Sequence, residues 1–179
     1  CVLADDSSVP DYVAADLLSQ AEHGADSQVL LVSTSKQLID AVNQSLLSQL
    51  TILPRKDLAI KALQNSRAVL MSHLSDAVEL VNDYAAEHLI IACQNANEIA
   101  EQISNAGSVF IGNYSPESVG DYASGTNHTL PTNAYARMYS GVSVDSFVKK
   151  ITFQQLTKEG LTAIAKTVET MAEAEGLQA

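Results

Sequence analysis

Two polar pairs in this chain combine residue types that bind metals or move protons. Gln20 and His23 stand three residues apart at the end of an apolar helical run, LLSQAEHG. That spacing puts both side chains on one face of the last helical turn, where they could hold one metal ion or a substrate. The alternative is a surface pair at a helix end, where a histidine also suits the helix dipole.

The second pair, Glu87 and His88, is adjacent in the chain. An acid beside an imidazole can supply two proton-transfer groups, because histidine titrates near neutral pH. The alternative is that His88 only satisfies the dipole at a helix C-terminus that precedes a strand.

A third candidate is the run GDYASGTNH, which contains Asp121 and His128. Its small residues let the backbone approach a ligand, and an aspartate is a hard oxygen ligand. The alternative is an ordinary surface loop. Together with the two pairs, these residues could form a closed metal site with a nearby base.

An alternation of strand and helix patterns must position these side chains. The strand-like runs are CVLA, SQVLLVS, AVLM, LIIAC and SVFIG, and helical runs separate them, one of them with Ser75 as its expected cap. Repeated β-α-β units predict an α/β fold with a parallel sheet and flanking helices. Since ligands bind at the carboxyl ends of strands in such sheets, we expect the candidates to meet at that edge.

The rest of the chain departs from this alternation. Residues 114–139 form a polar stretch that we expect to be irregular, and one long amphipathic helix is expected over residues 154–175. We therefore predict an α/β layer over residues 1–142 and a small helical appendage over residues 143–179. The sequence has no G-x-G-x-x-G fingerprint after a strand and no phosphate-binding loop.

The composition restricts the partners. Of 179 residues, 21 are acidic and 10 are Lys or Arg, a net charge of −11. Such a surface repels phosphate backbones and anionic lipids, so we expect neither nucleic acid nor membrane as a partner. The cysteines, Cys1 and Cys93, lie far apart and are typical of free thiols in a reducing compartment. The cytoplasm is the predicted location.

The segments DLLSQAEHG, EHLII, SNAGSVFIG and above all YSPESVGDYASGTNHTLPT resemble the histidinol dehydrogenase family. The resemblance covers essentially the whole chain. It implies a zinc- and NAD-dependent enzyme that oxidises L-histidinol through L-histidinaldehyde to L-histidine, the last step of histidine biosynthesis, with two NAD molecules consumed.

Matched residue by residue, the resemblance also implies roles within the site. His88 is the base that takes the alcohol proton, and Glu87 activates the water that attacks the aldehyde. The expected zinc ligands are Gln20, His23 and Asp121. The expected substrate-binding residues are these three with His88 and Glu175, the last reaching across a homodimer interface, and His128 is a further pocket residue.

Finally, the resemblance implies that this chain is a carboxy-terminal fragment, truncated at both ends. The family's chain is more than twice as long, and its NAD site lies in the amino-terminal part, so no cofactor-binding residue is expected here. The family's fourth zinc ligand is a histidine from the partner subunit, shortly after the position of Glu175, where this chain has none. We therefore expect a part of a Rossmann-like domain that is inactive alone. The alternatives are a non-catalytic α/β scaffold domain and, less favoured, a zinc hydrolase.

Overall fold

The computed structural model describes residues 1–177 and divides the chain into two units. The first unit is Cys1–Ser146 and the second begins at Phe147. The division falls after residue 146, where the sequence analysis placed it after residue 142.

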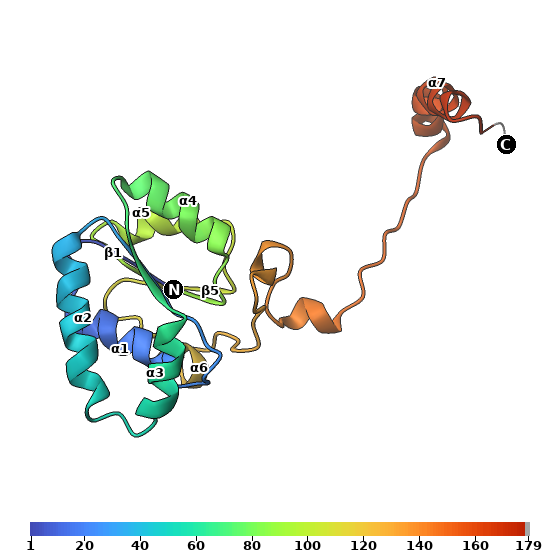
Figure 1. The fold of residues 1–179 in the computed structure, drawn as a ribbon. Helices are drawn as coiled ribbons and strands as arrows, with labels where there is room; N and C mark the ends of the chain where they lie inside the picture. The colour runs from blue at the N-terminus through green and yellow to red at the C-terminus, as the bar shows by residue number, and fades with distance from the viewer. Residues whose placement is uncertain (178–179) are drawn as a thin grey trace. The chain divides into compact units, whose positions relative to one another are not determined.

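The first unit is built on a five-stranded parallel sheet with the order β3-β2-β1-β4-β5 (Figure 1). The strands are β1 (Val2–Ala4), β2 (Leu30–Ser33), β3 (Arg67–Leu70), β4 (His88–Ala92) and β5 (Ser108–Ile111). In register, Leu3 of β1 lies opposite Val32 of β2 and Ile91 of β4. The predicted α/β fold with a parallel sheet is confirmed.

Helices cover both faces of this sheet (Figure 1). The helices of this unit are α1 (Pro10–Ala21), α2 (Lys36–Leu50), α3 (Lys56–Gln64), α4 (Leu74–Tyr84), α5 (Ala96–Ala100) and α6 (Glu117–Tyr122). Successive strand residues point to opposite faces. Ile90 therefore packs in the core beneath α1 to α3, whereas Leu89 packs in the core beneath α4 and α5.

Three local predictions need correction. The cap position of α4 is His73 rather than Ser75, and the Ser75 hydroxyl instead donates to the Asp76 carboxylate at 3.1 Å. The stretch expected to be irregular contains α6, which begins directly after Pro116. The long C-terminal helix, α7, spans Lys158–Ala174 and begins four residues later than expected.

The second unit consists of α7 and the segment before it. Thr157 caps the helix, because its hydroxyl accepts the Gly160 amide at 3.1 Å. No residue of α7 is buried within this unit. Four residues form an apolar stripe along the helix, and each has between 43% and 62% of its surface exposed: Leu161, Ile164, Val168 and Met171.

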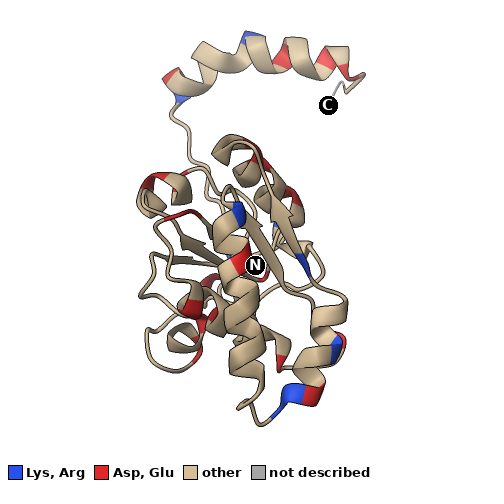
Figure 2. Ribbon diagram, turned by 60° about the vertical axis from the view of Figure 1, so that its left-hand side comes forward, with Lys and Arg blue, Asp and Glu red and all other residues tan. Residues whose placement is uncertain are grey.

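The charges of the first unit are mostly acidic, with 17 Asp and Glu residues against six Lys and Arg, whereas the second unit carries four of each (Figure 2). The acidic side chains are spread over several helices. Within residues 1–177, no helix is both long and apolar enough to span a membrane.

Candidate active site

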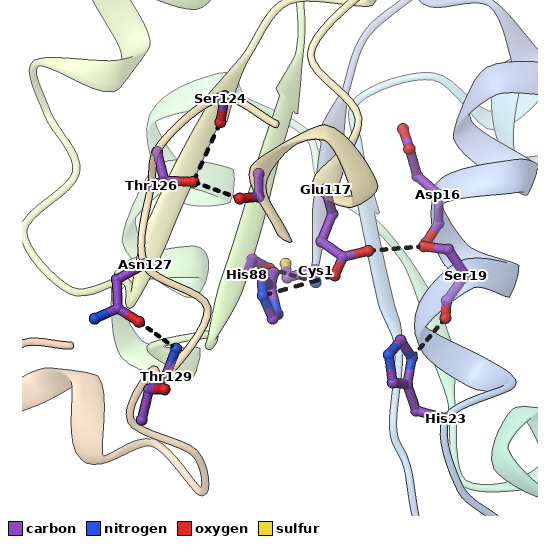
Figure 3. A network of polar contacts seen from close by, with 11 residues as sticks. Cys1, Asp16, Ser19, His23, His88, Glu117, Ser124, Thr126, Asn127 and Thr129 are labelled. Carbon is purple, nitrogen blue, oxygen red and sulfur yellow. Dashed lines mark hydrogen bonds and ion pairs between the residues drawn. The ribbon is translucent and has the colours of Figure 1, made fainter. Parts of the chain in front are cut away.

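The last turn of α1 holds the first candidate pair. The His23 ring lies just beyond the helix, with Nδ1 2.7 Å from the Ser19 carbonyl oxygen (Figure 3). The carbonyl can only accept, so Nδ1 carries the proton in this bond and Nε2 keeps its lone pair. A backbone carbonyl that fixes the tautomer in this way is typical of a metal-ligating histidine.

Glu87 and His88 lie where α4 gives way to β4. Helix α4 ends at Tyr84, and Ala85 takes a left-handed conformation with φ 51°, which turns the chain toward the sheet. His88 is the first residue of β4 and is 8% exposed, with its ring stacked on Phe110 at a centroid distance of 6.0 Å. It is thus a strand residue, so the helix-dipole alternative does not apply.

The protonation of His88 suits a base. Burial lowers the pKa of His88 below its ordinary value, although the Glu87 and Asp121 carboxylates partly oppose the shift. The neutral imidazole therefore prevails at neutral pH. Within residues 1–177, neither ring nitrogen has a hydrogen-bond partner, so one nitrogen is free to accept a proton.

Helix α6 brings Asp121 to the end of α1. Glu117 lies one turn before Asp121 on the same face of this short helix. Ligand atoms of His23, Glu117 and Asp121 all lie within 4.8 Å of one another. Of the predicted zinc ligands, the structure thus brings His23 and Asp121 together, whereas Asp121 was expected in an irregular loop.

Gln20 lies beside this cluster. Its side-chain nitrogen Nε2 is buried and has no hydrogen-bond partner in the described part of the chain. A buried NH₂ group without an acceptor is costly, and it can be satisfied only by an acceptor, so only the carbonyl oxygen of the Gln20 amide can bind a metal ion. An imidazole, a carboxylate and an amide oxygen are donors that zinc accepts, and these residues fit a zinc ion.

The predicted position of the site on the sheet is wrong. The candidates meet at the amino edge of the sheet, where α1 ends and β4 begins, and not at the carboxyl edge. In a β-α-β unit the helix runs back against the strands, so its C-terminus returns to the edge where the strands begin. Helix α6 then packs near the end of α1 and adds Asp121 there.

A cavity of about 710 Å³ opens beside these residues. Gln20, His23, Glu87 and His88 line it, together with residues of the segment 132–137. Asp121 and Glu117 are not among its lining residues. The predicted catalytic pair and the end of α1 therefore share one space that a small substrate could enter.

One predicted residue of the first unit, His128, is not brought into this cluster. His128 is exposed in a loop, where the neighbouring Asn127 side chain accepts the Thr129 amide at 2.7 Å. Glu175 is the C-terminal cap residue of α7, in the second unit. The substrate-binding roles of both residues remain predictions.

One residue that the sequence analysis missed is Glu117. It is 2% exposed, and its Oε2 accepts the Ser19 hydroxyl at 3.2 Å while its Oε1 lies 3.8 Å from His88 Nε2 (Figure 3). Burial and the Asp121 carboxyl raise the pKa of Glu117, whereas the Gln20 and Ser19 side chains lower it. The spacing of Glu117 and Asp121 after Pro116 is helical and could have indicated a shared face.

Comparisons with known proteins agree on one family. The family model described as histidinol dehydrogenase matches residues 1–179. The histidinol dehydrogenases of Bacteroides thetaiotaomicron and Bacteroides fragilis strain YCH46 are 55% and 57% identical to the chain over 178 residues. Those residues are 99% of this chain, and the chain spans 42% of either relative.

A solved structure gives the same result. The crystal structure of histidinol dehydrogenase from Elizabethkingia anophelis superposes on the chain with a TM-score of 0.92 at 55% sequence identity. The match covers 98% of this chain and 41% of that one.

Proposed function

The chain belongs to the histidinol dehydrogenase family, and from that premise we propose that it is part of an NAD- and zinc-dependent enzyme. The reaction is the oxidation of L-histidinol through L-histidinaldehyde to L-histidine, the last step of histidine biosynthesis. One observation supports this most directly. His23 and Asp121 meet at the end of α1, while His88 and Glu87 line the adjoining cavity.

The roles proposed for the residues follow from their chemistry. Gln20, His23 and Asp121 would hold the zinc ion, which when bound polarises the substrate oxygen as a Lewis acid. His88, neutral and with its ring nitrogens unpartnered, takes the proton of the alcohol hydroxyl as hydride leaves for NAD. Glu87 then removes a proton from the water that attacks the aldehyde in the second oxidation.

The parts outside the site are also proposals. We place this chain in the carboxy-terminal portion of the full-length parent, with the NAD site in the other portion. The exposed apolar stripe of α7 supports a role in packing on a partner chain, and Glu175 at its end would reach the partner's substrate. A homodimer and a cytoplasmic location are part of this proposal. The isolated chain, without the NAD portion, is expected to be inactive.

The test uses the full-length parent, supplied with L-histidinol, NAD and zinc. His88→Asn is expected to abolish NADH formation while the zinc content stays unchanged. Glu87→Gln should slow the oxidation of supplied histidinaldehyde more than the oxidation of histidinol, because its task is to activate water. His73→Asn is the matched control, since His73 is exposed and makes no side-chain cap.

Three results would contradict this proposal. A wild-type parent that forms no NADH would favour a non-catalytic scaffold domain. Turnover of simple esters or amides without NAD would favour a zinc hydrolase. Loss of zinc from His88→Asn would show that His88 belongs to the metal site rather than acting as the base.

A further inference from the structure

The most unusual side chain in the first unit is the carboxylate of Glu117. It is 2% exposed, and burying a carboxylate is costly unless charged or hydrogen-bonding groups compensate it. Within residues 1–177, the Glu117 carboxylate accepts one hydrogen bond of good geometry, from the neutral Ser19 hydroxyl at 3.2 Å to Oε2. That hydroxyl also lies 2.9 Å from the Asp16 carbonyl, so its single proton is shared between two acceptors. Ser19 alone therefore does not use all the acceptor sites of Glu117, and the Gln20 and Asp121 side chains also interact with this carboxyl group.

An unused donor lies beside it. Gln20 Nε2 is buried and carries two hydrogens with no acceptor among the described residues. The Gln20 side chain nevertheless interacts with Glu117 as a hydrogen-bond donor and so lowers the pKa of that carboxyl group, which places the two groups close together. A full hydrogen bond from the Gln20 amide to Glu117 would satisfy both buried groups at once.

The orientation of the Gln20 amide matters for a metal. An amide binds a hard or borderline cation through its carbonyl oxygen, and its NH₂ group repels the cation. An acceptor on the NH₂ side therefore decides which end of the amide faces the ion. Loss of a partner of this kind typically weakens metal affinity by about 10- to 100-fold.

The packing of α6 against β5 fixes the position of Glu117. Helix α6 approaches β5 closely because Gly120 has no side chain, and a Cβ there would lie 2.6 Å from Phe110 Cε1. Glu117 and Asp121 flank this contact on the same side of α6. One end of α6 thus faces the Ser19–Gln20 turn of α1 while the other brings Asp121 to His23.

We propose that Glu117 is a positioning residue of this site, whose buried carboxylate accepts the Gln20 side-chain NH₂ and so turns the Gln20 carbonyl oxygen toward the metal. The inference rests on the proposed zinc site. The competing arrangement has Glu117 bind the ion directly, since its carboxylate lies within 4.8 Å of ligand atoms of His23 and Asp121.

A double-mutant cycle on zinc affinity separates the two arrangements. In the full-length parent, Zn²⁺ dissociation constants are measured by competition with a chromophoric chelator for the wild type, Glu117→Leu, Gln20→Ala and the double variant. Glu117→Leu should weaken Zn²⁺ binding by about 10- to 100-fold, the range for partners of metal ligands. In the Gln20→Ala background the same change should have little further effect, because its target is gone.

Folding is controlled within the same set. An apolar side chain of similar size in place of a buried charge is often neutral or stabilising, so Glu117→Leu should fold. Glu117→Gln serves as a second variant, since it keeps a neutral acceptor and should lose less affinity than Glu117→Leu. Glu98→Gln is the matched control, because Glu98 is exposed in α5, and its affinity should equal that of the wild type.

Two results would overturn the proposal. Additive losses from Glu117→Leu and Gln20→Ala would show that Glu117 acts independently of Gln20, as a direct ligand would. Unchanged Zn²⁺ affinity in Glu117→Leu would show that it has no part in the site. A failure of the wild type to form NADH would instead refute the proposed function and leave this cycle interpretable, because it reads metal affinity alone.

Discussion

The contact between Gly120 and Phe110 allows a prediction that links packing to metal binding. A Cβ built at Gly120 lies 2.6 Å from Phe110 Cε1, 3.0 Å from Phe110 Cζ and 3.1 Å from Thr126 Oγ1. The Phe110 ring is 9% exposed and stacks on His88, so it has little room to move. Gly120→Ala must therefore shift either α6 or the Phe110 ring that stacks on His88.

The expected cost follows from these distances. Carbon atoms pack best at about 3.5–4.0 Å, so the helix or the ring has to move by about 1 Å. Overpacking of this kind costs about 1–3 kcal/mol, whereas Gly to Ala in a helix gains about 0.5–1 kcal/mol. We expect Gly120→Ala to lower the free energy of unfolding by about 1 kcal/mol, the difference between the midpoints of these two ranges.

The same displacement should weaken zinc binding. Asp121 follows Gly120 directly, and a metal site tolerates ligand distances only within about 0.2 Å. We expect the Zn²⁺ dissociation constant to rise by about tenfold or more. Losing a residue that hydrogen-bonds to a metal ligand has a comparable effect. Adding Phe110→Leu should shrink the effect of Gly120→Ala on Zn²⁺ affinity, because the ring edge that it meets is removed.

Urea unfolding of the metal-free parent and chelator competition for Zn²⁺ measure the two effects. Gly160→Ala in α7 is the control, since its Cβ would meet only the Thr157 hydroxyl at 3.3 Å, and its Zn²⁺ affinity should match the wild type. A Gly120→Ala variant with wild-type stability and Zn²⁺ affinity would refute the argument that this contact places α6.

Further predictions concern the surroundings of the site. Gly107→Ala should destabilise the fold by more than about 2 kcal/mol, because its Cβ would lie 2.5 Å from the backbone oxygen of Glu87. That oxygen cannot move without breaking the β4–β5 pairing. Urea unfolding measures the effect, and wild-type stability would contradict it. Burial and the nearby Glu117 charge raise the pKa of Asp16 from 3.8 to about 6. Because the folded-state pKa lies above the unfolded value, the free energy of unfolding of the metal-free protein should fall as pH rises from about 4 to about 6. Asp16→Asn should remove the contribution of Asp16 to this dependence of stability on pH. An identical pH dependence in the variant would exclude Asp16 as its source. Ser35→Ala should cost about 1 kcal/mol in urea unfolding and leave Zn²⁺ affinity unchanged, because the Ser35 hydroxyl caps α2 far from the site by accepting the Leu38 amide; no loss of stability would show that the cap contributes nothing.

Several features of this protein follow from the sequence because they are local. The apolar runs around Leu31 and Ile90 are short and bounded by polar residues, so they predicted buried strands, and the helical runs between them required parallel crossovers. Helical spacing also predicted that Gln20 and His23 lie together at the end of α1, although His23 lies just beyond the last residue of that helix. The family resemblance named His88 and Asp121 from motifs, and the structure places both near the end of α1.

Other features depend on contacts between segments that lie far apart in the chain. The edge of the sheet on which the site forms was predicted incorrectly, because it depends on where α1 ends relative to the start of β4. Glu117 was missed for a similar reason. Its exposed fraction of 2% results from α6 packing onto Phe110 and the end of α1, about a hundred residues away along the chain. Sequence spacing shows which side chains share a helical face, but only the tertiary packing decides which of them lose their water and must find partners inside the protein.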